Sequence, residues 1–226
     1  MRLAFVAAGA AQGLVAALAA THAVQVGGSF GAVGAMKDKL LSGEPCDVVI
    51  LTSAQIAELA RTERVLADTV ANLGSVATSI AVRESDAAPF VSDARSLADA
   101  LRSAEALYFP DPAKATAGIH FAGVLQKLGI ASEVAARTKT FPNGATAMRE
   151  LARSGGRSIG CTQATEILAT PGVRLVAPLP SGFELQTVYT AAVATGSTQA
   201  DAARRFIGLL SAESSRPLRV AAGFQV

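Results

Sequence analysis

Two runs of small residues could bind an anion through their main chain. They are Gly9, Ala10, Ala11 and Gln12, and Gly31, Ala32, Val33 and Gly34. Each run opens an expected helix, where the first N–H groups lack partners within the helix and the helix dipole favours negative charge. Neither run has the GxxxxGK[ST] spacing of a phosphate loop or GxGxxG spacing. Small residues at such turns also serve close packing, but two runs in successive strand–helix units favour anion binding.

Further helix starts in the second half of the chain offer hydroxyl and amide donors. The candidate ligand-binding residues there are Thr116, Ala117, Gly118, Asn143, Gly144, Thr162 and Gln163. Thr116 is expected to be the N-cap of its helix, a structural role that competes with ligand contact.

His120 and Glu166 are the side chains that could move a proton, as an acid–base reaction on a carboxylic acid would require. Each also has a structural interpretation: His120 packs at the surface, and Glu166 complements the dipole of its helix. Lys114 and Arg149 could pair with the carboxylates of a substrate or simply face water. With two histidines in the chain and no Cys/His cluster, we expect no metal site and no cofactor.

Composition narrows the class of protein. The chain has 226 residues, of which 50% are hydrophobic, 17% charged and 5% aromatic, with a net charge of +2. That charge is too small to indicate a nucleic-acid partner. Cys46 and Cys161 form no CxxC motif, and two buried free thiols are favoured over one disulfide.

The N-terminus allows two interpretations. Residues 1–23 resemble a secretory signal, with one positive charge, an apolar stretch and small residues at a possible cleavage point. The alternative is a buried strand at residues 3–8 followed by a helix at 10–20, and Gln12 with two glycines in the apolar run favours it. We therefore expect a cytoplasmic protein without membrane insertion, or a periplasmic one if an upstream signal has been removed.

Short β-branched runs alternate with helical stretches, which predicts an α/β fold with parallel strands. Strands are expected at residues 3–8, 24–28, 48–51, 106–109, 138–141, 157–160 and 173–176, with helices at 10–20, 31–42, 52 onward, 96–103, 117–128, 144–152, 162–168, 198–210 and 213–221. Extended runs near 73–82 and 187–195 are expected hinges. They would join one lobe, residues 1–78 and 190–226, to a second, residues 79–189, with a ligand cleft between them.

The chain resembles the molybdate-binding proteins of bacterial ABC importers. The resemblance extends over nearly the whole length and rests on residues 5–9, 29–32, Gly43-Glu44-Pro45-Cys46-Asp47-Val48, Asp111-Pro112, Ala117-Gly118-Ile119 and residues 173–180. It implies a type II periplasmic-binding fold of two α/β lobes that close on an oxyanion held by hydroxyls and main-chain N–H groups. It also implies an ABC transporter as a partner.

Three departures from that family change the expected ligand. Where the family carries ligand serines, this chain has Gly9 and the stretch Ala32–Gly34, and where it often has a tyrosine the chain has Cys161. A buried dianion would lose about 1.5–3 kcal/mol for each missing charge-assisted hydrogen bond. A di- or tricarboxylate is therefore expected rather than molybdate. Divergent members of the family resemble aconitate isomerase, so a cytoplasmic isomerase of a small polycarboxylate is the alternative to a binding protein.

Overall fold

The computed structural model describes residues 2–226, and their contacts divide the chain into two compact units. Unit 1 comprises the chain up to Val76 together with Thr187–Val226, and unit 2 is Ala77–Gln186. The chain passes between the units within β4 (Ala71–Arg83) and at the start of β9 (Gln186–Val193). The sequence-based lobes, residues 1–78 with 190–226 and residues 79–189, remain a prediction about which parts act together.

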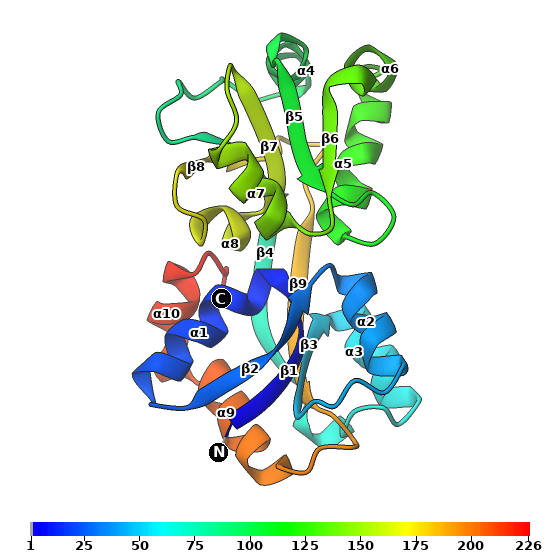
Figure 1. Ribbon diagram of the computed structural model, residues 1–226, viewed down its shortest axis with the longest axis vertical. Helices are drawn as coiled ribbons and strands as arrows, with labels where there is room; N and C mark the ends of the chain where they lie inside the picture. Colours follow the sequence, from blue (N-terminus) through cyan, green and yellow to red (C-terminus); the bar gives the residue numbers. More distant parts are fainter. Residues whose placement is uncertain (1) are drawn as a thin grey trace. The chain divides into compact units, whose positions relative to one another are not determined.

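Unit 1 has a sheet with the strand order β2-β1-β3-β9-β4. β1 is parallel to β2 and β3, and β9 is antiparallel to β3. Besides β4 and β9 the elements are β1 (Arg2–Ala8), η1 (Gly9–Ala11), α1 (Gln12–Thr21), β2 (Gln25–Gly31), α2 (Val33–Leu41), β3 (Val48–Thr52), α3 (Ser53–Arg61), η2 (Ala67–Thr69), α9 (Ala200–Ser211), η4 (Glu213–Ser215) and α10 (Arg216–Ala221). Helices α1, α9 and α10 cover one face of the sheet, and α2 and α3 cover the other (Figure 1).

Coverage on both faces explains the uninterrupted apolar character of β1 and β3. Residues 5–8 and 48–51 are all buried, as expected for parallel strands between two helical layers. The ring of Phe5 stacks on Phe30, with 6.0 Å between centroids, and meets Phe206 of α9 edge-on at 5.6 Å. An aromatic contact thus holds α9, from the end of the chain, on its first strand.

β2 is longer than the sequence indicated. A strand at 24–28 and a helix from residue 31 were expected, but β2 continues to Gly31 and α2 begins at Val33. Gly28 pairs with Phe5 at φ +123°, and a Cβ there would lie 2.1 Å from the Phe5 carbonyl oxygen. The two main chains therefore approach each other more closely than any other residue would allow, so this glycine serves strand pairing.

Unit 2 has the strand order β4-β7-β5-β6, with β8 also paired to β4. β5 is parallel to β6 and β7, whereas β4 is antiparallel to β7 and β8. Its other elements are α4 (Ala94–Ser103), β5 (Ala106–Pro110), α5 (Thr116–Lys127), α6 (Ala131–Val134), η3 (Ala135–Arg137), β6 (Thr138–Phe141), α7 (Gly144–Ala152), β7 (Ser158–Gln163), α8 (Ala164–Leu168) and β8 (Val173–Pro178). The expected helix at 162–168 begins two residues later, because β7 stays paired with β4 as far as Gln163.

Side chains that alternate in direction along the strands divide the interior of unit 2 into two apolar cores. On β5, Leu107 and Phe109 point into the core beneath α4, α5 and α6, while Ala106 and Tyr108 face α7 and α8. This period of two places successive side chains on opposite faces of the sheet. Figure 1 shows the corresponding helices on the two faces of the unit 2 strands. Both faces are therefore covered, and the strand ends are where ligand contact is possible.

Asp47 joins three segments of unit 1. Its carboxylate accepts hydrogen bonds from the Ala4 N–H at 2.9 Å, the Gln199 side chain at 3.1 Å and the Ser197 hydroxyl at 2.7 Å. The side chain is buried at 4% exposure. The aspartate therefore links β1 and β3 to the turn that begins α9, which gives the Gly-x-Pro-x-Asp-Val stretch a structural role.

Replacing Asp47 by Ala should lower the free energy of unfolding by roughly 3–5 kcal/mol, because three donors lose a charged acceptor. Ser197→Ala, which removes only one of those donors, should cost about 1 kcal/mol. Urea unfolding followed by circular dichroism measures both values. Equal stability of Asp47→Ala and the wild type would contradict this role.

Candidate functional site

The helix starts differ in whether a side chain caps them. Thr52 caps α3, Asp93 caps α4 and Asn143 caps α7, each by accepting a main-chain N–H. The residues before η1, α2 and α5 are Ala8, Ala32 and Ala115, which make no side-chain cap. The first N–H groups of an α-helix have no partner within it. Helices α6, α8, α9 and α10 also start without a side-chain cap. Each of the starts at η1, α2 and α5 directly follows or lies close to the end of a parallel strand, where an external acceptor could approach.

Two of these uncapped starts adjoin at one edge of unit 1. Ala8, the last residue of β1, pairs with Gly31, the last residue of β2. The chain then enters η1 at Gly9 and reaches the N-cap of α2 at Ala32. The two runs singled out in the sequence thus follow paired strand ends, and the positive ends of their helices lie at the same sheet edge.

The small residues of this edge are largely buried. All of Gly9, Ala10, Ala11, Ala32 and Val33 are buried. Gln12 is exposed and Gly34 is half-buried. What the edge offers a ligand is main-chain N–H and a thin apolar lining, with few side-chain donors.

Unit 2 has a second edge of this kind, at the carboxyl ends of β5, β6 and β7. Pro110 pairs with Phe141, so β5 and β6 end together, and β7 is parallel to β5. Helices α5, α7 and α8 all start there. The edge therefore contains every unit 2 residue proposed from the sequence as a ligand contact.

Thr116 is not the N-cap that the sequence predicted. The N-cap is Ala115, and Thr116 is the first helical residue, without a capping bond. Asp111 explains the change: its Oδ1 accepts the Ala113 N–H at 2.7 Å and its carbonyl accepts the Ala115 N–H at 3.1 Å, so the turn is formed before Thr116. Within residues 2–226 the Thr116 hydroxyl has no hydrogen-bond partner, which leaves it available to a ligand.

Gly118 sets the position of α5. A Cβ at Gly118 would lie 2.2 Å from the Pro110 carbonyl oxygen and 2.4 Å from that of Asp111. Both obstacles are main chain, which cannot rotate away. The glycine of the Ala-Gly-Ile motif thus allows the first turn of α5 to pack directly against the end of β5.

Glu166 of α8 directs its carboxyl group at the start of α7. Its Oε2 accepts the Thr162 hydroxyl at 2.6 Å, and its carboxylate also accepts the N–H groups of Gly144, Ala145 and Gln163. Glu166 itself is buried at 7% exposure. Burial raises the pKa of this carboxyl above its ordinary value, and the four hydrogen bonds lower it in part.

The hydrogen bonds to Glu166 reduce the number of main-chain N–H groups that the start of α7 can offer a ligand. A Cβ at Gly144 would lie 1.9 Å from Glu166 Oε2 and 2.0 Å from the Thr162 hydroxyl, so only glycine fits. The side chain of Asn143 caps Thr146 N–H at 2.8 Å. The Gly144 N–H thus has an internal acceptor, and the Asn143 amide oxygen has an internal donor. Contact of either residue with a ligand stays a prediction.

His120 lies in the second turn of α5, in the same unit as Glu166. Its Nε2 is 2.7 Å from the carbonyl oxygen of Phe183. Because a carbonyl only accepts, Nε2 carries the proton, and a neutral ring then has Nδ1 as an acceptor. The ring is half-buried. His120 is thus oriented by the main chain, and a role in proton transfer stays a prediction.

Two hydroxyls that the sequence did not single out lie near this edge. Thr78 of β4 pairs with Gln163 of β7, and Thr165 follows in α8. Both side chains are at least 96% buried, and their hydroxyl oxygens have no hydrogen-bond partner among the described residues. Buried hydroxyls without a partner are uncommon. Thr78 and Ser79 interrupt the apolar run at 76–82, which was the available signal for Thr78.

The remaining candidates have other roles. Cys161 is a free thiol packed in the apolar core beneath α5, and Cys46 is free and buried as expected. Arg149 donates to the Thr146 hydroxyl at 2.8 Å on the surface of α7. Residues 2–226 contain no cluster of three or more His, Cys, Asp or Glu side chains suited to a metal ion. Nor does that part of the chain have a helix long and apolar enough to cross a membrane.

Comparison with known proteins places this geometry among binding proteins. Residues 4–225 match the family model described as bacterial extracellular solute-binding protein. The periplasmic molybdate-binding protein of Azotobacter vinelandii superposes with a TM-score of 0.78 at 17% identity, over 99% of both chains. The sulfate-binding protein SubI of Mycobacterium tuberculosis H37Rv gives 0.70 at 21% identity, over 99% of this chain and 86% of that one. These neighbours show the two-lobed binding-protein fold.

One sequence relative is an enzyme. Aconitate isomerase from a Pseudomonas species is 24% identical over 182 residues, which is 80% of this chain and 68% of the relative.

Gly118→Ala should lower the free energy of unfolding by roughly 2–3 kcal/mol, because the new methyl group meets fixed main chain. Gly123→Ala on the same helix is the matched control. Gly123 is exposed and a Cβ there meets nothing within 4 Å, so that change should stabilise the protein by about 0.5–1 kcal/mol. Chemical unfolding compares the two. If both alanines stabilise, the close approach at Gly118 is wrong.

Proposed function

Because the chain belongs to the bacterial extracellular solute-binding protein family, we propose that it is a receptor for a small anion, a di- or tricarboxylate rather than molybdate. The observation that carries the proposal is the pair of uncapped helix starts, at Gly9 and Ala32, on adjacent strand ends. Their N–H groups and dipoles favour one negative group at this edge. The uncapped start of α5 in unit 2, with the Thr116 hydroxyl, offers donors of the same kind.

The kind of donor favours a carboxylate. Main-chain N–H groups and an alanine lining suit a planar carboxylate with an attached carbon chain, whereas a tetrahedral dianion needs donors around all its oxygens. The first two loops supply no hydroxyl, since Gly9, Ala10, Ala32 and Val33 carry none.

Glu166 supports the same choice. Its carboxyl group already holds the start of α7, with four donors directed to it. When ionised it would repel a second negative charge brought close to it, and when protonated it could donate to one. A ligand whose charges are spread over separate carboxylates avoids that repulsion better than a compact dianion.

The proposed partner of a loaded receptor is an ABC transporter. The same fold occurs in a protein from Clostridium difficile described as the substrate binding domain of a putative molybdenum ABC transporter, at a TM-score of 0.68 and 17% identity. Delivery to a transporter would require ligand release on contact, which suits a site built on N–H groups without a metal or covalent link.

A thermal-shift screen with molybdate, tungstate, sulfate, succinate, citrate and trans-aconitate tests the proposal. A carboxylate at 100 times its Kd should add about 2.7 kcal/mol of stability, which is roughly 5–10 °C in Tm for a chain of this size. Thr116→Asp should weaken that carboxylate at least tenfold by placing a negative charge at the α5 start. Gly123→Asp adds the same charge two turns away and should change affinity by less than about threefold. Stabilisation by molybdate or sulfate alone would overturn the carboxylate assignment.

A second candidate function, a cytoplasmic isomerase of a small polycarboxylate, is favoured by the aconitate isomerase relative and by Glu166. An allylic shift removes a proton from one carbon and returns one to another, with no net oxidation and no cofactor. A buried carboxyl whose pKa is raised is suited to hold such a proton. His120, with Nε2 bound to Phe183, could supply the second group.

Proton NMR of trans-aconitate incubated with the protein tests this alternative. Conversion to cis-aconitate should fall at least 100-fold in Glu166→Gln, which cannot exchange the proton. Glu150→Gln, which removes a half-buried carboxylate of α7 that pairs with Arg153, should keep the wild-type rate. Tight binding of trans-aconitate without conversion would reject the isomerase and leave the receptor.

A further inference from the structure

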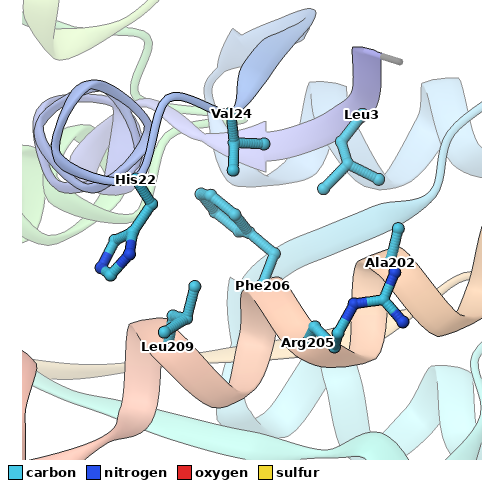
Figure 2. Close-up of a pocket in the computed structure, with 7 residues that line it drawn as sticks. All are labelled: Leu3, His22, Val24, Ala202, Arg205, Phe206 and Leu209. Atoms are coloured by element: carbon cyan, nitrogen blue, oxygen red, sulfur yellow. The ribbon is translucent and has the colours of Figure 1, made fainter.

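Unit 1 has a pocket away from the candidate anion edge. Its volume is about 300 Å³, and it is lined by Leu3, His22, Val24, Ala202, Arg205, Phe206 and Leu209. Figure 2 shows these side chains, which come from the start of β1, the turn after α1 and one face of α9. The α9 residues recur at spacings of three and four, so they share a single helix face.

The pocket lies at the opposite end of the strands from the anion edge. Leu3 is near the beginning of β1 and Val24 comes just before β2, whereas Gly9 and Ala32 follow the ends of those strands. Seven residues of extended chain separate the two edges by roughly 20 Å. A ligand here would therefore not compete with one at the anion edge.

The floor of the pocket is apolar and firmly packed. Leu3 and Phe206 are each 2% exposed. The Phe206 ring contacts Phe5 edge-on, with 5.6 Å between centroids and an interplanar angle of 76°. Val24 and Leu209 are half-buried at the sides. A floor held in this way is preformed for a flat or extended hydrocarbon group.

Two basic side chains border this floor. In Figure 2, His22 and Arg205 lie on opposite sides of Phe206. Both are exposed, and neither side chain has a hydrogen bond or ion pair within the described part of the chain. The neighbouring Arg204, by contrast, pairs with Asp68 at 2.8 Å. The pocket thus combines an apolar floor with one guanidinium, that of Arg205, which no acidic side chain among residues 2–226 neutralises.

We propose that this pocket binds a small amphipathic carboxylate, such as a medium-chain alkanoate. The carboxylate would pair with Arg205, whose planar guanidinium can hold both oxygens. The hydrocarbon chain would lie over Phe206 and Leu209. His22, just after the C-terminal end of α1, borders the other side of the floor.

NMR titration of ¹⁵N-labelled protein with hexanoate tests the proposal. Hexanoate should shift the amide signals of α9 and of residues 22–24, and each CH₂ added from butyrate to hexanoate should tighten binding about three- to fourfold. Arg205→Gln should weaken hexanoate at least fivefold. Arg204→Gln, which removes the same charge from the same helix outside the pocket, should leave it unchanged. Ala202→Leu fills part of the pocket and should weaken hexanoate while the chain stays folded.

Two further ligands separate the contribution of the hydrocarbon chain to binding from that of the carboxylate. Hexanol retains the hydrocarbon chain and lacks the charge, whereas succinate retains charge and lacks the apolar end. Titration of the pocket amide signals should therefore show that each binds at least fivefold more weakly than hexanoate. Equal binding of hexanol, equal weakening by Arg204→Gln, or no shift at α9 with hexanoate would each overturn the proposal. The receptor function is decided separately, by shifts at residues 9–12 and 31–34 with di- and tricarboxylates.

Discussion

Free N–H groups at the starts of buried helices are the constraint around which this protein is organised. Each start at a strand end needs an acceptor, because these groups lie beside a covered sheet. The chain supplies acceptors at α3 and α7 through Thr52, Asn143 and Glu166. It supplies no side-chain cap at η1, α2 or α5. Helices α6, α8, α9 and α10 also lack a side-chain cap, so the candidate site is defined by uncapped starts that lie at the ends of parallel strands and not by the lack of a cap alone.

Close main-chain packing brings those starts to their positions. Gly118 lets α5 contact the last residues of β5, and Gly28 lets β2 lie against Phe5. Gly144 admits the Glu166 carboxylate beside the first turn of α7. In each case a methyl group would meet another atom below 3 Å, so the glycines at these points serve approach between segments. Glycine at a helix start therefore indicates either packing or ligand contact, and the neighbouring atoms decide which.

Membership in the solute-binding family and the likeness to an isomerase are compatible on one scaffold. Both need a site that holds carboxylates by fixed main-chain donors, and an isomerase needs in addition a group that carries a proton. Glu166 is a residue whose burial and hydrogen bonds would serve either role, as a fixed negative neighbour or as a proton carrier. A small change around this carboxyl could therefore separate a receptor from an enzyme.

The sequence by itself determined the α/β class, the alternation of elements and the family, because periodicity and short motifs are local properties. It also indicated the small-residue runs at Gly9 and Ala32. Only the tertiary structure decided which donors already have partners. Thr116 lost its expected capping role to the turn at Asp111, and the α7 start proved to hold Glu166, twenty-two residues away from Gly144. The hydroxyls of Thr78 and Thr165 emerged in the same way. Hydrogen-bond satisfaction depends on contacts between distant segments, which residue spacing along the chain does not encode.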